Sequence, residues 1–384
     1  MKGNMKVRSS VLSRSVATTV VTSLLCLLPA SNERAQIVVG GISVGGSSSS
    51  TASTSTSDTT SYRGEAAVVA GAALGVGLSV SDTGPLPSSG GAQETSLLSA
   101  EAQMMLSAEA AHASTIGQAG MTASEASVGN VMFTTCNTML IGGNTISADF
   151  VMSHAMASCC TNGASLSGSS EIAGLVINGQ AITVSAQPNQ CIYLAGGSMI
   201  VINEQITSQT ADSADITVNA LHVKLCEGAD VVVSSSFAGV TCGTSSSGSG
   251  GGTNPPGSCN DFLTGGGWIT GTPSGAKANF GVGGGFKNGA FWGHLNYIDH
   301  GTGMHVKATA VTGYAVDADS DCRIIDYNVT IDGDAGTARV RACDKGEPGR
   351  NDIFQIQLSN GYFAGGDLGG SRPGGGNIQL HKCQ

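Results

Sequence analysis

The chain has 384 residues, of which 4% are aromatic and 11% charged, and its 27 acidic residues against 17 lysines and arginines give a formal net charge of −10. Between Arg63 and Lys224 it contains no lysine or arginine. A region without cations has nothing with which to hold phosphate backbones or anionic membranes, so we expect no nucleic-acid partner. Trypsin should leave residues 64–223 whole even after denaturation.

Residues 1–36 are typical of a secretory signal. A basic start is followed by the apolar run Val16 to Leu28 and by small residues near Ala30 and Ala35. The apolar run is too short to span a bilayer, so we expect no membrane span. Without this segment, 12 basic residues remain against 26 acidic ones, for a formal charge of −14. We therefore expect an acidic, secreted, extracellular protein.

Composition divides the remainder. Residues 37–61 are a low-complexity segment rich in Gly, Ser and Thr, and residues 243–258 (GTSSSGSGGGTNPPGS) have the composition of a flexible linker. We expect a domain at 62–242 and another at 259–384. Both should be antiparallel β domains, sandwich or barrel-like, joined by the Gly/Ser/Pro linker.

The first of these domains alternates apolar and polar residues with period two, as in ISADFVMSHAMAS and DITVNALHVKL, which predicts strands. Asn178-Gly179 is the strongest hairpin signal. The stretch from Gln93 to Ala113 is rich in helix formers but also alternates, and we favour strand there. The domain should be all-β with an aliphatic core.

The second domain holds most of the aromatic residues and again alternates strands with turns. If Asp332-Gly333 is a two-residue turn, Ile331 pairs with Asp334 and Ile325 lies opposite Val340. The same register places Cys322 opposite Cys343, within disulfide reach. We predict that bridge.

Ten cysteines follow the signal segment, and disulfides are the default for an exported chain. We predict a second bridge, Cys259–Cys383, between the two ends of the second domain. Zinc is the alternative, but no CxxC spacing occurs. Connectivity stays open among the six cysteines of the first domain: Cys136, Cys159, Cys160, Cys191, Cys226 and Cys242.

Several strings resemble the choice-of-anchor P family of secreted bacterial proteins: SVSDTGPLPSSGGAQETSLLSA, HASTIGQ, ISADFVMSHAMASC and GSSEIAGLVINGQAITVSAQPNQ. The resemblance covers roughly Tyr62 to Ser236 and implies an exported surface or matrix protein without an assigned activity. The chain ends in LHKCQ rather than an anchoring tail, so we expect release. GGGWITG and GHLNYIDHGTGMHVKATAVTGY are similar to the small β domain that commonly follows such modules.

Two groups of side chains are candidate metal ligands. Asp317, Asp319 and Asp321 alternate as calcium-loop oxygens do, and extracellular calcium would neutralise them; apart from calcium we expect no cofactor. The EF-hand glycine and distant glutamate are absent, so a solvated loop is the alternative. His294, His300 and His305 surround one predicted hairpin, where satisfied or exposed histidines are the alternative to a metal site.

Trp268, Trp292 and Tyr297 are candidate ligand-binding residues, because rings offer apolar faces to sugars. Their alternative role is as core residues, which a small domain needs inside. We find no catalytic motif such as GxSxG, HExxH or a P-loop, and assign no catalytic residue.

We therefore expect a disulfide-bonded structural or interaction protein outside the cell, without catalytic activity. Its partner would be another extracellular protein, a polysaccharide or a second copy of itself. A carbohydrate-binding module is the alternative, and an extracellular hydrolase is third. A deep pocket that holds two carboxylates would favour the hydrolase.

Overall fold

The protein, described from a computed structural model, is built of β-strands; the described residues contain no α-helix. This confirms the all-β class. The description covers residues 36–39, 60–73, 76–102, 106–134, 143–160, 163–194, 197–225, 228–243, 261–287, 289–347, 349–370 and 375–382. No helix among them is long and apolar enough to cross a membrane.

The first sheet has seven strands in the order β1-β3-β2-β14-β13-β12-β11, antiparallel except for the parallel pair β1–β3. Its strands are β1 (Gln36–Val39), β2 (Ser61–Ala73), β3 (Val76–Asp82), β11 (Gln190–Tyr193), β12 (Met199–Gln209), β13 (Ser213–Lys224) and β14 (Asp230–Thr241).

The middle sheet runs β10-β9-β7-β6-β5-β4, and β8 also pairs with β7. Its strands are β4 (Gly91–Ala102), β5 (Leu106–Gln118), β6 (Met121–Thr134), β7 (Thr145–Cys160), β8 (Gly163–Ala173), β9 (Val176–Ile177) and β10 (Gln180–Ala181).

The third sheet has nine antiparallel strands in the order β22-β21-β20-β19-β18-β17-β16-β15-β23 and curls into a half-barrel. Its strands are β15 (Phe262–Ile269), β16 (Ala278–Lys287), β17 (Ala290–Asp299), β18 (Met304–Val316), β19 (Cys322–Ile331), β20 (Asp334–Cys343), β21 (Ile353–Leu358), β22 (Phe363–Asp367) and β23 (Gly376–His381).

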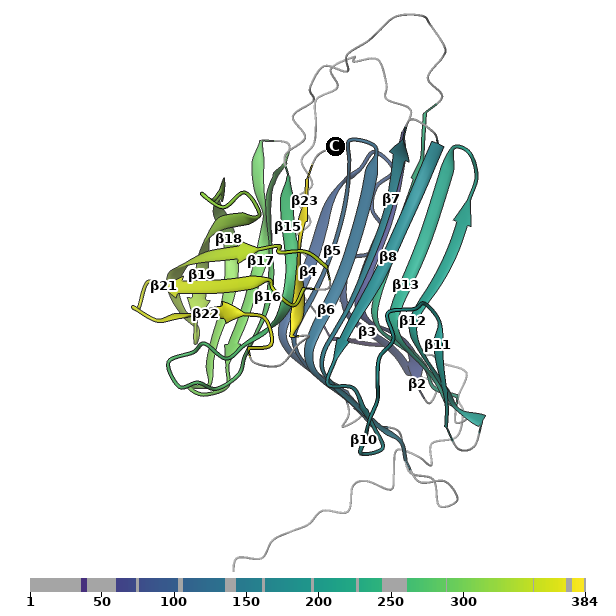
Figure 1. Ribbon diagram of the computed structural model, residues 1–384, viewed down its shortest axis with the longest axis horizontal. Helices are drawn as coiled ribbons and strands as arrows, with labels where there is room; N and C mark the ends of the chain where they lie inside the picture. The colour runs from purple at the N-terminus through teal and green to yellow at the C-terminus, as the bar shows by residue number, and fades with distance from the viewer. Residues whose placement is uncertain are drawn as a thin grey trace, which may run out of the picture. The chain divides into compact units, whose positions relative to one another are not determined.

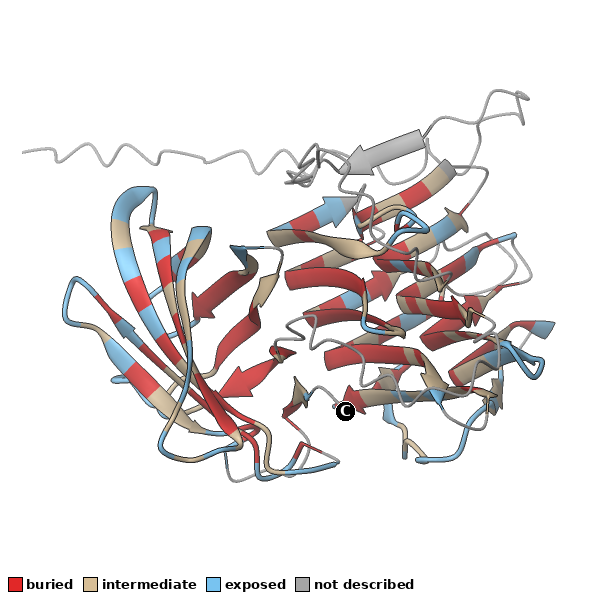
Figure 2. Cartoon of the chain, turned by 90° about the horizontal axis from the view of Figure 1, so that it is seen from above, coloured by how far each residue is buried: buried red, intermediate tan, exposed pale blue. Residues whose placement is uncertain are grey.

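The middle sheet contacts both others, and strands β4–β8 take part in each contact (Figure 1). Its long strands are therefore buried along most of their length, whereas the far side of the third sheet reaches solvent (Figure 2). Residues Glu33–Gln384 form one compact unit by their contacts. The division into domains at 62–242 and 259–384 stays a prediction, because the linker lies mostly outside the described residues.

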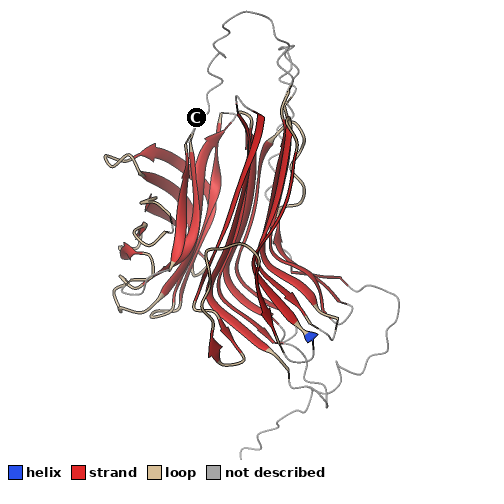
Figure 3. Ribbon diagram, turned by 45° about the vertical axis from the view of Figure 1, so that its right-hand side comes forward, coloured by secondary structure: helices blue, strands red, loops and turns tan. Residues whose placement is uncertain are grey.

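Residues with positive φ interrupt the pairing of the first two sheets. Asn203 and Ser234 have positive φ and drop out of the pairing in the first sheet, and Ala110 and Asn130 do the same in the middle sheet. The register itself shifts between β5 and β6, and a β-bulge of this kind bends the strand that carries it. The strands accordingly curve together in their lower part (Figure 3).

Local pairing follows the sequence closely. The register predicted around Asp332-Gly333 is confirmed, from Ile331 opposite Asp334 to Ile325 opposite Val340. Both turn residues have positive φ, as a type I′ turn requires. Asn178-Gly179 likewise connects β9 to β10, and the described residues between Gln93 and Ala113 lie in strands β4 and β5.

Candidate functional site

The face of the middle sheet that meets the third sheet carries buried ionisable side chains. Strand alternation directs His112, Glu125 and His154 to this face, and they are 0%, 2% and 8% exposed. We call this group of facing side chains the polar layer. It consists of Glu94, His112, Glu125 and His154 from the middle sheet and Thr264, His294 and His381 from the third sheet.

One half of the polar layer is a stacked histidine pair. The rings of His112 and His294 are parallel, with centroids 3.2 Å apart. Glu94 Oε2 lies 3.5 Å from His294 Nδ1, too far for a good hydrogen bond. Glycine makes the space, because a Cβ on Gly283 would come within 2.5 Å of the His294 ring.

The other half is a hydrogen-bonded chain. The Thr264 hydroxyl donates to Glu125 Oε2 at 2.6 Å and lies 3.0 Å from His381 Nε2. A hydroxyl has one hydrogen, so Thr264 accepts from His381 Nε2–H while it donates to Glu125. His381 Nδ1 is then left as a hydrogen-bond acceptor. The His381 ring stacks on Phe262, and its centroid is 5.4 Å from that of His154.

Burial disfavours the charged form of each of these groups. Desolvation raises the pKa of Glu125 to about 8 and that of Glu94 to about 7. It lowers the pKa of His154 to about 4 and of His294 to about 3, and it holds the pKa of His381 well below its usual range. At neutral pH the imidazoles therefore carry no charge and each offers one donor and one acceptor.

A cavity of about 470 Å³ opens at the edge of the polar layer. His154 and His381 both line it. Its remaining walls come from the β5–β6 turn, the end of β7, the segment after β20 and the end of β23, and they consist of Gln118, Ala119, Gly120, Met121, Met156, Ser158, Cys159, Asp344, Glu347, Gln379, Leu380 and Lys382.

The carboxylates at the cavity are held in place. Asp344 accepts the backbone N–H of Leu380 at 2.9 Å, and Glu347 accepts from the side-chain amides of Asn377 and Gln379 at 3.0 and 2.7 Å. Fixed acceptors of this kind can orient a hydroxylated or cationic ligand.

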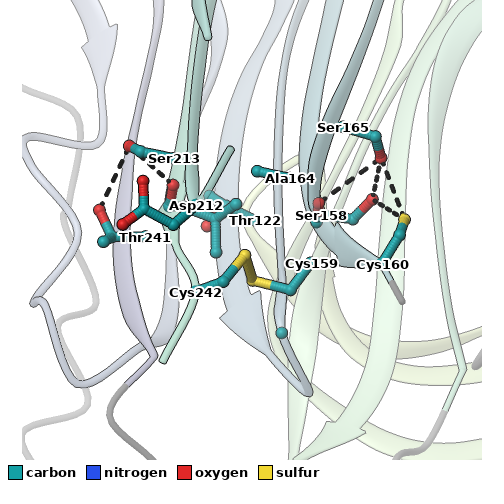
Figure 4. The surroundings of a disulfide bond; sticks show 12 residues. Thr122, Ser158, Cys159, Cys160, Ala164, Ser165, Asp212, Ser213, Thr241 and Cys242 are labelled. Atoms are coloured by element: carbon teal, nitrogen blue, oxygen red, sulfur yellow. Dashed lines mark hydrogen bonds between the residues drawn. A yellow bond between two sulfur atoms is a disulfide. The ribbon is translucent and has the colours of Figure 1, made fainter. Parts of the chain in front are cut away.

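A disulfide between Cys159 and Cys242 joins β7 of the middle sheet to the segment after β14 of the first sheet (Figure 4). The neighbouring Cys160 is exposed and free, and points away from the bridge. Ser165 Oγ lies 3.2 Å from its sulfur, and this contact lowers the pKa of the Cys160 thiol.

The structure also pairs Cys322 with Cys343 in a disulfide, across the register described above. Cys259 and Cys383 lie outside the described residues. The bridge predicted between them stays a prediction.

The three aspartates considered for calcium are neutralised by side chains of the protein. Asp317 pairs with Arg341 at 2.6 Å, Asp319 with Lys345 at 2.6 Å, and Asp321 with Lys382 at 3.2 Å. No group of three or more metal-ligating side chains occurs in the described part of the chain. The arrangement is a loop closed by ion pairs, so calcium is not needed for its charge balance.

The aromatic residues considered for sugar stacking do not form an exposed platform. Tyr297 is fully buried and its hydroxyl bonds to that of Tyr362 at 2.7 Å. Trp268 is 6% exposed and packs on Phe150, while Trp292 is half-buried against Phe262. This burial leaves Trp268 and Tyr297 no free ring face.

The predicted hairpin histidines do not converge either. His294 belongs to the polar layer, His300 lies 3.3 Å from Glu109, and His305 is exposed. The sequence reading missed Glu125, His154 and His381 altogether. A signal was present in the glycine run of β16, because glycines on one strand face permit the close approach of another sheet.

Comparison with known proteins leaves the chain without a family. No family model and no curated protein matches it. Solved structures with some likeness include kievitone hydratase from Nectria haematococca, at 8% identity and a TM-score of 0.18 over 84% of this chain and 89% of that one. A candidate AttH from Nitrosomonas europaea has 7% identity and a TM-score of 0.17 over 68% and 87%. At these scores neither likeness informs fold or function.

Proposed function

We propose that this is a secreted structural or interaction protein of the extracellular space, which binds its partner without transforming it. The observation that carries the proposal is the use of its ionisable side chains. In the described residues His112, His294 and Glu125 are packed between sheets, and most aspartates on the third sheet are ion-paired or bonded to backbone N–H groups. These groups support packing rather than meeting a substrate.

Two disulfides support the extracellular location. Bridges persist in oxidising compartments, and the pair here fastens β7 to the first sheet and β19 to β20. Sheets that are cross-linked by disulfides suit a protein that must remain folded outside the cell.

Glutamine side chains cap one sheet edge and argue against strand-to-strand self-assembly there. Gln205 Nε2 donates to the Gly168 carbonyl at 3.0 Å, and Gln209 Nε2 donates to the Ala164 carbonyl at 2.6 Å. Both carbonyls belong to β8, whose outer edge would otherwise be open to another strand. We expect a monomer by light scattering, with and without calcium.

An extracellular hydrolase is the second candidate. It is favoured by one observation, the pair of carboxylates Asp344 and Glu347 at the cavity. If it is correct, Glu347→Gln should abolish turnover of a glycoside that the unsubstituted protein cleaves.

The test is a binding and turnover screen of the full chain on an array of polysaccharides and extracellular proteins. We expect retention of at least one ligand and no product after prolonged incubation. Product that appears with the unsubstituted protein and disappears with Glu347→Gln would replace the proposal by the hydrolase.

A further inference from the structure

We propose that the cavity between β7 and β23 binds a neutral polyhydroxylated ligand, such as the terminal residue of a sugar chain, through His154 and His381. The inference rests on the proposed interaction function and names its ligand class. It does not use the aromatic residues Trp268 and Tyr297, whose faces are covered.

The first observation is a buried nitrogen without a partner in a residue that lines the cavity. His154 is 8% exposed and lines the cavity, and its Nε2 has no hydrogen-bond partner among the described residues. A buried polar atom without a partner costs about 1–3 kcal/mol, and that cost is relieved by a group that hydrogen-bonds to it.

The second observation is the fixed orientation of His381. Thr264, which donates to Glu125, accepts from its Nε2–H, and Phe262 covers one face of its ring. His381 thus presents its Nδ1 in a set direction. Because burial keeps both rings neutral, His381 Nδ1 can accept from a ligand hydroxyl, while His154 Nε2 is a donor or an acceptor according to its tautomer, and a hydroxyl group can serve either.

The remaining wall narrows the ligand class. Met156 and Leu380 supply apolar surface, while Gln379 and Glu347 supply polar atoms. Such a mixture suits the C–H faces and hydroxyl edges of a pyranose. Asp344 and Glu347 outnumber Lys382, so the wall repels anionic ligands.

The experiment is isothermal titration of the full chain with neutral monosaccharides (glucose, galactose, mannose and N-acetylglucosamine) and with glucuronic acid. We expect at least one neutral sugar to bind in the millimolar range or better. Glucuronic acid has the glucose ring with a carboxylate added, and it should bind at least about tenfold more weakly than the neutral sugars that bind.

Two variants locate the site. His154→Gln removes the imidazole and should weaken binding by about tenfold, the equivalent of one hydrogen bond. Met156→Trp fills the cavity and should abolish binding. The control is His305→Gln, which alters an exposed histidine elsewhere on the third sheet and should leave affinity unchanged.

A readout on the unsubstituted protein guards against variants that do not fold. Added sugar should shift the NMR ring signals of His154 and His381 and leave those of His305 in place. Absence of binding by every neutral sugar, or binding that leaves the His154 and His381 signals unmoved, would overturn the inference. Retention of a macromolecular ligand in the array screen would then leave the proposed interaction function standing by itself.

Discussion

The two faces of the middle sheet solve the burial of polar atoms in different ways. Toward the first sheet the polar groups are hydroxyls, and they bond across the gap: Thr122 to the Gly239 carbonyl at 2.8 Å, and Ser234 to the Ala126 carbonyl at 2.6 Å. Toward the third sheet they are carboxyls and imidazoles, several with unpartnered atoms. Small hydroxyls let two sheets approach closely. The face with ionisable groups instead borders a cavity, and its stability depends on pH.

The pH dependence has opposite signs for the two kinds of group. The folded-state pKa of Glu125 is raised, so its contribution to stability is complete below about pH 4.5 and is lost as pH rises toward about 8. The folded-state pKa of His154 is lowered, so stability is lost as pH falls from about 6.5 toward about 4. The two slopes offset each other between about pH 4.5 and 6.5, so the contact with the third sheet should be most stable in that window.

The largest effect on stability should come from a substitution in the hydrophobic core between the first and middle sheets. Phe133 is 2% exposed in the core between the first and middle sheets. Phe133→Ala should lower the free energy of unfolding by about 3–5 kcal/mol through lost contacts and a cavity. Urea denaturation at pH 6 and pH 8 should give the same loss, because no charge is involved.

The matched control for that substitution is Ile206→Ala, since Ile206 is 59% exposed in the first sheet. Its effect should stay within about 0.5 kcal/mol. Equal losses for the two substitutions would contradict the placement of the core.

Removal of a disulfide should have the next largest effect on stability. Cys159–Cys242 closes a sequence separation of 83 residues and Cys322–Cys343 one of 21. Paired alanine substitutions should cost about 4 kcal/mol for the first bridge and about 3 kcal/mol for the second, since a longer loop gains more freedom in the unfolded chain. Thermal unfolding of the two variants shows which bridge contributes more to stability. A larger loss of stability on removing Cys322–Cys343 would contradict the prediction.

Substitutions in the polar layer should change how the stability of the protein depends on pH. In the unsubstituted protein, Glu125 should lower the free energy of unfolding by about 3 kcal/mol as pH rises from 4.5 to 7, and Glu125→Gln should abolish this decrease. His154 should cause a similar decrease as pH falls from 6.5 to 4, and His154→Gln should abolish that one. Denaturation curves measured at several pH values give a profile of stability against pH. Each variant should flatten only one side of that profile, Glu125→Gln the side of higher pH and His154→Gln the side of lower pH. Parallel curves for the unsubstituted protein and both variants would mean that these groups are solvated.

The smallest effect should be that of calcium. Because Asp317, Asp319 and Asp321 already have basic partners, millimolar calcium should leave the melting temperature unchanged. Asp319→Asn should not alter that result. A calcium-dependent rise that Asp319→Asn abolishes would restore the calcium site.

Local features could be predicted from the sequence because neighbours in the chain decide them. Asp332-Gly333 sets a two-residue turn, and the turn sets every pair up to Cys322 and Cys343. Asn178-Gly179 works in the same way at β9 and β10.

The polar layer could not be predicted, because its residues meet across long separations; Thr264 and Glu125 are 139 residues apart. Alternating polar positions in β5–β7 indicate a solvated face, and nothing local shows that a third sheet covers it. The sequence groups His294 with its chain neighbours His300 and His305, because its actual partner His112 is remote in sequence. The aromatic residues were weighed as a platform for the same reason, since burial of Trp268 depends on Phe150 of the middle sheet.

The most direct test of the account is an NMR titration of the histidine rings from pH 8 to pH 3.5. Burial under the third sheet predicts that His112, His154, His294 and His381 all stay neutral at pH 5. Titration of these four rings near pH 6.5, the value for a solvated imidazole, would contradict the central claim that the third sheet covers the polar face of the middle sheet.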